Sequence, residues 1–157
     1  MEKLAKPGQY LTFRLKGQTY GVPIGSVREI NRLTKIIEVP QTPAFVAGVI
    51  NLRGKVIPIV TLRLKFGLEN TEHTKNTCII VIDGECGQVG MIVDQVSGVM
   101  DLVDEQIEAT PEIGDAAKLR HVIGMAKAND TVIILVDVAR TLSKEELSGC
   151  LPTEEAA

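Results

Sequence analysis

The chain has 157 residues, of which 45% are hydrophobic, 24% charged and 3% aromatic, and its formal net charge at pH 7 is −3. Without a basic cluster it lacks the positive footprint of a nucleic-acid-binding protein, and no apolar stretch approaches the roughly 20 residues that cross a bilayer. Tryptophan is absent, so the core must be built from valine, isoleucine and leucine, which favours strands.

The cysteine pattern argues against a metal centre. Cys78, Cys86 and Cys150 are three in number and none sits in a C-x-x-C pair, which indicates free thiols in a reducing cytoplasm. A structural zinc site would need four closely spaced ligands, and the only other candidates are His73 and His121. We therefore expect neither a metal nor a cofactor.

The N-terminal elements alternate strands with turns. Residues 10–15 alternate apolar and polar side chains, as a half-buried strand does, and residues 20–22 form a second strand after a turn. Pro23 suits the first position of a helix. The apolar residues that follow it recur at helical spacing and predict a short helix: Ile24, Val27, Ile30 and Leu33.

Short elements follow on both sides of a long hairpin. Residues 35–40 are expected to form a short strand, and Thr42 to cap a helical turn that Gly48 ends. After the hairpin, Thr61 is expected to cap a short helix that closes at Gly67.

The hairpin itself is the segment GVINLRGKVIPIV, residues 48–60. Its tip carries Arg53, whose planar guanidinium suits the recognition of a carboxylate, although a turn arginine can also simply face solvent. Pro58 lies inside the second strand, and because proline survives in a strand only at an edge or a bulge, it predicts a barrel corner.

The second half repeats this pattern after a polar linker at 67–76. The expected elements are a hairpin over 77–94 turning at Asp83-Gly84, an apolar strand or short helix at 95–103, an irregular stretch at 105–120, a hairpin over 122–138 around Asn129-Asp130, and a C-terminal helix opened by Ser143 and Glu146.

The two halves resemble each other. Gly48–Leu62 aligns without a gap on Gly124–Val138, Tyr20–Ile24 on Val89–Val93, and Val27 on Val96. Leu11–Leu15 is aligned over Cys78–Ile82, and Pro40 over Pro111. Valine-rich hairpins can align by chance, but the matched glycines, prolines and element order favour a duplication. Each unit is too small to fold alone, so the two should pack together.

No catalytic constellation is present in the sequence. Gly54-Lys55 lacks the upstream glycine and the following Ser or Thr of a phosphate loop. The acidic residues Asp94, Asp101, Asp104 and Glu105 are interpreted as a solvated face. A small hydrolase built on Asp94 and this acidic cluster is the enzyme alternative, although the roles of nucleophile, base and stabiliser are unfilled.

Three segments, YGVPIGSVREI (20–30), PAFVAGVINLRGKVIPIVTLR (43–63) and VGMIVDQVSGVM (89–100), closely resemble CheW, the coupling-protein family of bacterial chemotaxis arrays. The resemblance covers residues 9–147 and implies a mainly β fold of two packed SH3-like five-stranded antiparallel barrels with short helices. The subdomains would span about 15–75, with hairpin strands added, and about 77–147, and residues 1–8 and 151–157 would be flexible.

The resemblance also implies a role. The chain would be a non-enzymatic cytoplasmic adaptor, a monomer in isolation, that couples chemoreceptor tips to the histidine kinase CheA within membrane-associated arrays. An alternative is an adaptor of a non-flagellar chemosensory pathway. The implied receptor-binding residues are Ile24, Val27, Glu29, Gly48, Asn51, Arg53, Val93 and Val96, and the implied kinase-binding residues are Ile36, Ile37 and Val39.

Overall fold

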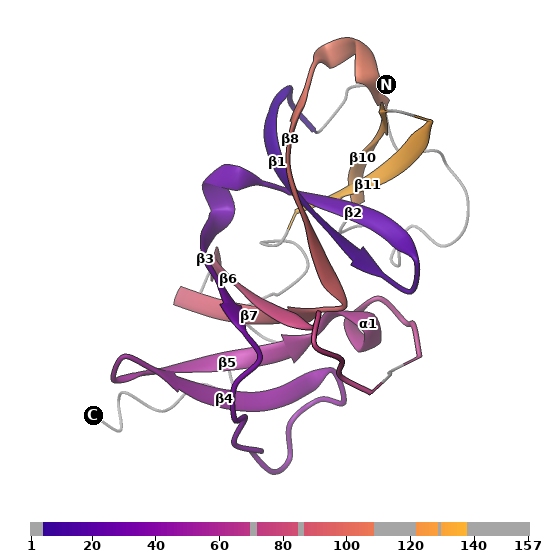
Figure 1. Cartoon of the computed structure of the whole chain (residues 1–157). Coiled ribbons are helices and arrows are strands. Elements are labelled where there is room, and N and C mark those ends of the chain that lie inside the picture. Colours follow the sequence, from indigo (N-terminus) through magenta and orange to yellow (C-terminus); the bar gives the residue numbers. More distant parts are fainter. Residues whose placement is uncertain (1–4, 70–71, 85–86, 109–121, 129, 138–157) are drawn as a thin grey trace.

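The computed structural model describes residues 5–69, 72–84, 87–108, 122–128 and 130–137. Its strands form two curved sheets, one above the other in Figure 1. Sheet 1 has six strands in the order β8 (Gln95–Leu102), β1 (Gly8–Leu15), β2 (Gln18–Pro23), β11 (Thr131–Val136), β10 (Val122–Ala128) and β9 (Ile107–Glu108). Sheet 2 has five, in the order β3 (Val27–Arg32), β6 (Cys78–Gly84), β7 (Gly87–Val93), β5 (Lys55–Thr61) and β4 (Val46–Leu52).

The mainly β prediction is confirmed, with two differences in detail. Each sheet contains one parallel pair, β5 with β7 and β11 with β2, because strands from two separate hairpins meet there. Sheet 1 also has one strand more than predicted, and no pairing between described residues closes either sheet at its edge strands. The helices are short: η1 (Ile24–Ser26), α1 (Leu62–Lys65) and η2 (Asp104–Gln106).

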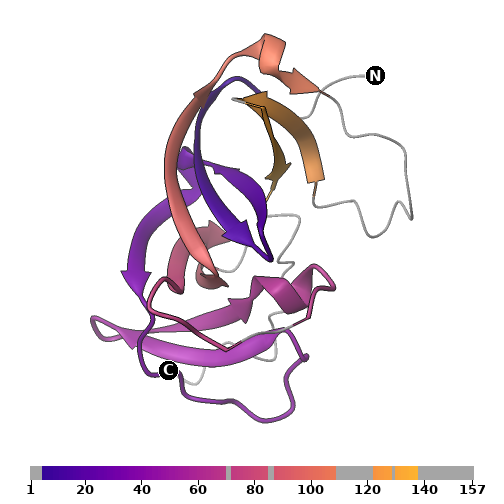
Figure 2. The same cartoon turned by 45° about the vertical axis from the view of Figure 1, so that its right-hand side comes forward.

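The sheets do not divide the chain near residue 76, as the predicted subdomains did. Sheet 1 takes strands from residues 8–23 and 95–136, whereas sheet 2 takes strands from residues 27–93. The chain therefore crosses between the sheets twice, at η1 and at Asp94. Figure 2 shows both crossovers on one side of the molecule, where β8 leads up into sheet 1 and β3 leads down into sheet 2.

The duplication predicted from the sequence is visible in the strand pairing. Ile59 pairs with Gly90 in sheet 2, and their counterparts Leu135 and Gly21 pair in sheet 1. Each β4-type strand also carries its register shift at the matching place, between Val46 and Gly48 and between Val122 and Gly124.

The first strand was aligned two residues out of register. Tyr10 pairs with Pro23, and the corresponding pair in the second unit is Ile79 with Ile92, so Leu11 matches Ile80 and not Cys78. Alternating apolar residues repeat every second position, so a slip of two residues leaves the hydrophobic pattern unchanged and cannot be detected from it.

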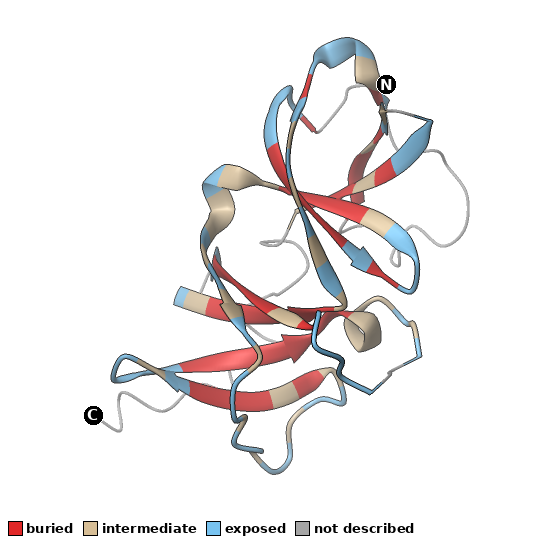
Figure 3. Cartoon of the chain, viewed as in Figure 1, coloured by how far each residue is buried: buried red, intermediate tan, exposed pale blue. Residues whose placement is uncertain are grey.

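Three hydrophobic clusters hold the fold together. One lies within each sheet, and the largest, which we call the shared core, lies between them. Strand β6 is buried on both faces, since Ile79 and Val81 face the cluster of sheet 2 while Ile80 and Ile82 face the shared core. Figure 3 shows this continuous burial where the sheets meet. The shared core consists of Leu11, Phe13, Leu15, Tyr20, Val22, Val60, Leu62, Ile80, Ile82, Val89, Met91, Val93 and Val136.

The predicted helix after Pro23 is wrong beyond its first turn. Only Ile24–Ser26 is helical, as a single 3-10 turn, and residues 27–32 form strand β3 with alternating burial. Pairing with the buried strand β6 overrides the helical spacing, because β6 offers a complete row of backbone partners. The predicted helical turn at residues 42–48 is also absent, since β4 begins at Val46, and the predicted strand at 35–40 is reduced to one bridge between Ile37 and Val49.

Pro58 sits in an interior strand, not at a corner. Val49 lies opposite Pro58, but its backbone N–H and C=O both bond Ile37 at 2.8 Å, on the far side from β5. Val49 and Pro58 are therefore a non-hydrogen-bonded pair, so β4 requires no N–H from the proline. Pairing of β5 with β7 begins one residue later, at Ile59, so the missing donor is not required there either.

Most of the other predicted strands and helices are present in the structure. The hairpins β4–β5, β6–β7 and β10–β11, the strand at β8 and the helix α1 are confirmed, although no side-chain hydrogen bond from Thr61 caps α1. Asp83 and Gly84, predicted as the turn, belong to strand β6 and pair with Gln88 and Gly87 of β7. Within the range 1–8 that was expected to be flexible, Ala5 is buried and β1 begins at Gly8. Residues 151–157 and the predicted C-terminal helix lie outside the described residues.

Candidate protein-binding groove

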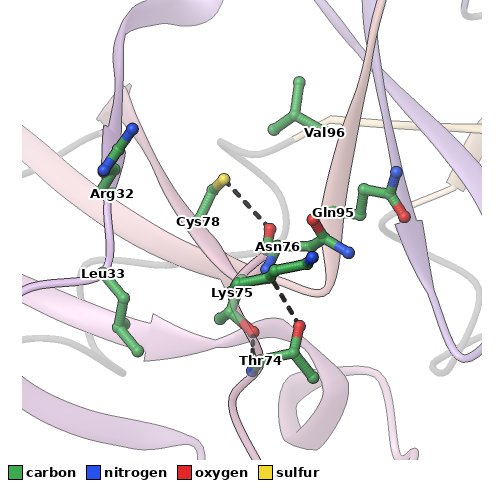
Figure 4. A pocket seen from close by; sticks show the side chains of 9 residues that line it. Arg32, Leu33, Thr74, Lys75, Asn76, Cys78, Gln95 and Val96 are labelled. Atoms are coloured by element: carbon green, nitrogen blue, oxygen red, sulfur yellow. Dashed lines mark hydrogen bonds between the residues drawn. The ribbon is translucent and has the colours of Figure 1, made fainter.

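A surface cavity of about 650 Å³ lies between the end of the edge strand β3, at Arg32, and the start of the edge strand β8, at Gln95. Figure 4 shows Arg32 and Leu33 on the β3 side and Gln95 and Val96 on the β8 side, with the start of β6 between them. The cavity and the exposed strand faces beside it are called the groove below. The cavity is lined by Arg32, Leu33, Thr74, Lys75, Asn76, Thr77, Cys78, Gln95 and Val96.

Two exposed apolar side chains mark the rim of the groove. Ile30 on β3 is 44% exposed and Val99 on β8 is 54% exposed. Ile30 pairs with Ile80, and Val99 pairs with Leu11. Because residues directly opposite in an antiparallel pair share a face, both side chains point toward the open border of the shared core. A shift of 69 places Ile30 on Val99, so the duplication provides one apolar contact on each wall.

The groove also carries positive charge. Arg32 at the end of β3 and Lys75 before β6 both line the cavity, whereas Arg28, farther along β3, is paired with Asp83 at 3.4 Å. An apolar rim with neighbouring cations suits an amphipathic helix that bears acidic residues beside its apolar stripe.

The predicted receptor-binding residues do not form one surface. Val96 lines the cavity, and Ile24 and Val27 are half-buried against the shared core. Val93 is fully buried in the shared core, and Gly48 is buried in β4. Neither residue reaches the surface, although both had been predicted to contact the receptor. Both were implied by the resemblance to the CheW family, and a match to a sequence motif does not reveal which face of a strand a partner can reach.

Arg53 and Glu29 form an ion pair on the opposite face of β3 from Ile30. Arg53 Nη1 donates to Glu29 Oε1 at 3.2 Å, and Nη2 bonds the second carboxylate oxygen. This hydrogen bond to Arg53 lowers the pKa of Glu29. The predicted carboxylate partner of Arg53 is therefore present within the chain, while the guanidinium itself stays exposed at the hairpin tip.

The hairpin tip is a tight two-residue turn. Arg53 and Gly54 both have positive φ, 52° and 88°, which is the backbone of a type I′ turn. Asn51 Oδ1 accepts a hydrogen bond from the Gly54 amide at 2.9 Å and so fixes the turn from within. This contact gives Asn51, which was predicted as a partner contact, a local structural role.

Gly48, predicted as a receptor contact, allows a close backbone approach, and the approaching backbone belongs to the same chain. A β-carbon at Gly48 would lie 2.1 Å from the carbonyl oxygen of Ile37. The predicted kinase-binding segment is thus held against β4 at this point. Ile37 itself is 55% exposed, while Ile36 is half-buried against the cluster of sheet 2 and Val39 is half-buried.

Asp94, on which the alternative prediction of a hydrolase was built, has both carboxylate oxygens hydrogen-bonded within the chain. Its oxygens accept bonds from Arg63 Nε at 2.8 Å, Arg63 Nη2 at 2.5 Å and the Lys16 amide at 2.9 Å. The hydrogen bonds from Arg63 hold its pKa below the usual value, which makes it a poor general base. Within the described part of the chain, no three His, Cys, Asp or Glu side chains gather as a metal site.

Ile30 and Val99 were not predicted as site residues. Ile30 had been assigned to the apolar stripe of a short helix, and Val99 to an apolar strand or short helix without further role. The signal that could have found them is the duplication itself, because an apolar residue repeated at the matching position of two edge strands is a candidate for a repeated function.

Two sheets around a shared core, with a groove between their edge strands whose rim carries exposed apolar side chains, define a β-rich module for binding proteins. The chain belongs to the CheW family, since residues 9–146 match the family model for the CheW-like domain. No helix among the described residues is long and apolar enough to span a membrane.

Similar proteins agree with this assignment. Chemotaxis protein CheW of Klebsiella aerogenes is 36% identical over 140 residues, covering 89% of this chain and 84% of that protein. Chemotaxis protein CheW of Helicobacter pylori is 33% identical over 138 residues, covering 87% of this chain and 82% of that protein. The crystal structure of the scaffolding protein TtCheW from Thermoanaerobacter tengcongensis has a TM-score of 0.80 and 32% identity, covering 89% of this chain and 95% of that one.

Proposed function

We propose that this chain is a non-enzymatic coupling adaptor of bacterial chemotaxis, which links the tips of chemoreceptors to the histidine kinase CheA in membrane-associated arrays. The observation that carries the proposal is the groove between β3 and β8 in a chain of the CheW family. The relatives described above are named as chemotaxis proteins, which favours this role over a different chemosensory pathway.

The receptor tip is proposed to bind in the groove as a helix. Ile30 and Val99 would supply apolar area on the two walls, and Arg32 would pair with an acidic side chain of the helix. Arg53 pairs with Glu29 on the other face of β3, so it would contact the receptor only beyond the edge of the groove. Its bond to Glu29 would either break before this contact forms or be kept alongside it.

The kinase is proposed to bind sheet 2 at the segment before β4. Ile37 is its most exposed apolar residue, and the paired hydrogen bonds between Ile37 and Val49 hold the segment in a fixed position. A rigid exposed apolar side chain loses little conformational entropy when a partner covers it, which favours its use as a contact.

The proposal is tested by reconstitution with CheA and receptor-containing membranes, in which kinase activity should depend on the chain. Binding to a receptor cytoplasmic fragment is then compared for Ile30→Asp and Val132→Asp. Val132 is a matched control because it is 43% exposed and lies on β11, away from both walls of the groove. We expect Ile30→Asp to weaken binding by about tenfold, as loss of a buried apolar contact does, and Val132→Asp to bind like the unchanged chain. Equal binding by the folded Ile30→Asp variant would remove β3 from the receptor site.

A further inference from the structure

Asp94 occupies the single position between the end of β7 in sheet 2 and the start of β8 in sheet 1. The chain therefore changes sheets at this residue. The two residues that follow it, Gln95 and Val96, line the cavity on the β8 side. Any movement of Asp94 relative to sheet 2 would move this wall of the groove.

Groups from both sheets converge on the Asp94 side chain. Arg63 of α1, which directly follows β5 of sheet 2, binds both carboxylate oxygens in a two-point contact. The Lys16 amide, in the β1–β2 turn of sheet 1, donates to the same carboxylate. The Asp94 amide in turn donates to the Arg14 carbonyl of β1 at 3.1 Å. One residue is thus bonded to elements on both sides of the junction.

The contact is partly shielded from solvent, which strengthens it. The Arg63 side chain is 14% exposed and the Asp94 side chain 27%. Arg63 is fixed further by a bond from Nη1 to the carbonyl of Glu69 at 3.0 Å. A planar guanidinium held at three points has one preferred orientation, so the pair resists rotation of α1 against the start of β8.

The second crossover lacks this contact. A shift of 69 places Gly25, in η1, at the position of Asp94. Glycine has no side chain to bond, and no side-chain hydrogen bond caps η1. The β3 wall of the groove is therefore joined to sheet 1 through the backbone of η1 and apolar packing. The β8 wall has, in addition, the bonds between Asp94 and Arg63.

We propose that the Asp94–Arg63 pair is a clasp that fixes the orientation of the two sheets and so sets the separation of β3 and β8 for the partner helix. Asp94 and Arg63 are positioning residues, since they shape the groove without lining it. The part of this inference that concerns the helix rests on the proposed function, whereas the part that concerns sheet orientation does not.

The test measures orientation and binding separately. Spin labels are placed on cysteines substituted for Gln9 of β1 and Lys55 of β5, both exposed and in different sheets, after Cys78, Cys86 and Cys150 are replaced by serine. Distance distributions from pulsed EPR are compared for the unchanged pair, Asp94→Asn and Arg63→Gln. Affinity for a receptor cytoplasmic fragment is measured on the same proteins without labels.

The matched control is Lys127→Gln, which removes the ion pair between Lys127 and Glu108 within sheet 1. We expect both clasp variants to broaden the inter-sheet distance distribution and to weaken fragment binding at least about threefold, and the control to change neither. If Asp94→Asn does not fold, Arg63→Gln decides, because it leaves the bond between Asp94 and the Lys16 amide in place.

An unchanged distance distribution in the folded clasp variants would overturn the inference. A broadened distribution with unchanged affinity would overturn its link to the groove. If the chain without substitutions fails to bind the fragment, the proposed function fails, but the distance distributions still decide whether the clasp exists.

Discussion

Replacement of Gly48 by alanine should detach the segment that precedes β4. Gly48 has φ of 145°, a conformation that L-residues rarely adopt, and an added β-carbon would lie 2.1 Å from the Ile37 carbonyl oxygen and 2.9 Å from Ile36 Cγ2. The nearest obstacle is backbone, which cannot rotate away as the end of a side chain can. The segment must therefore move, and the two hydrogen bonds between Ile37 and Val49 must break.

The cost follows from these contacts. Two backbone hydrogen bonds contribute about 1 kcal/mol each, and alanine at this φ adds about 1–2 kcal/mol of strain. The free energy of unfolding should fall by about 3–4 kcal/mol in total. For a chain of this size that corresponds to a decrease in Tm of roughly 6–16 °C.

The assay is urea denaturation together with amide hydrogen exchange at Ile37 and Val49. Gly124→Ala is the control, since Gly124 holds the matching position in sheet 1 but its β-carbon would lie 3.1 Å from the nearest carbonyl, that of Glu108. We expect the control to cost less than about 1 kcal/mol. If Gly48→Ala is no more destabilising than Gly124→Ala, or if the Ile37 and Val49 amides stay protected, the close-approach argument is wrong.

Three further predictions concern charge and packing. Arg53→Glu should remain folded, as judged by circular dichroism, but should bind receptor fragments about tenfold more weakly. The reason is that a charge-assisted contact is lost and a carboxylate now faces Glu29. Unchanged binding would exclude Arg53 from the site. The pKa of Asp94 is lowered on folding, so the ionised carboxylate stabilises the folded protein above the unfolded pKa near 3.8, and this stabilisation is lost as the pH falls below that value. Between pH 5 and pH 2.5 the midpoint of urea denaturation should therefore fall less steeply for Asp94→Asn than for the unchanged chain. Gly90→Ala should lower the free energy of unfolding, measured by calorimetry, by about 1–3 kcal/mol, because its β-carbon would meet two isoleucine side chains at 2.5 and 2.8 Å. Gly21→Ala, with contacts of 3.2 and 3.3 Å, should lower it less. Equal losses in the two variants would contradict the packing argument.

Local pattern was sufficient for the hairpins and failed for the edge strand β3. The hairpins were predictable because an apolar run lies on each side of a short turn, as at Arg53-Gly54. At β3, apolar residues at Ile24, Val27 and Ile30 fit a helical period equally well, and the decision came from β6, which lies far away in sequence. Long-range pairing of this kind leaves no mark in the local period.

The candidate site was predictable only in part for the same reason. The sequence pointed to Val96 and to the arginine at the hairpin tip, and both are accessible. It could not show that Val93 is enclosed in the shared core, or that Glu29 in the same chain already bonds Arg53. Exposure and side-chain partners depend on which strands become neighbours, and that is a property of the assembled sheets.

By itself, the sequence determined the β-rich class, the positions of the hairpins, the internal duplication and the family, because each of these is written in short-range periodicity, glycine and proline positions, or a continuous motif. Only the tertiary structure decided that each sheet draws strands from both halves of the chain, that the groove lies between β3 and β8, and that Asp94 joins the two sheets through Arg63. These features arise from contacts between residues distant in the chain, whose pairing is selected by the burial of a common core and not by any local preference.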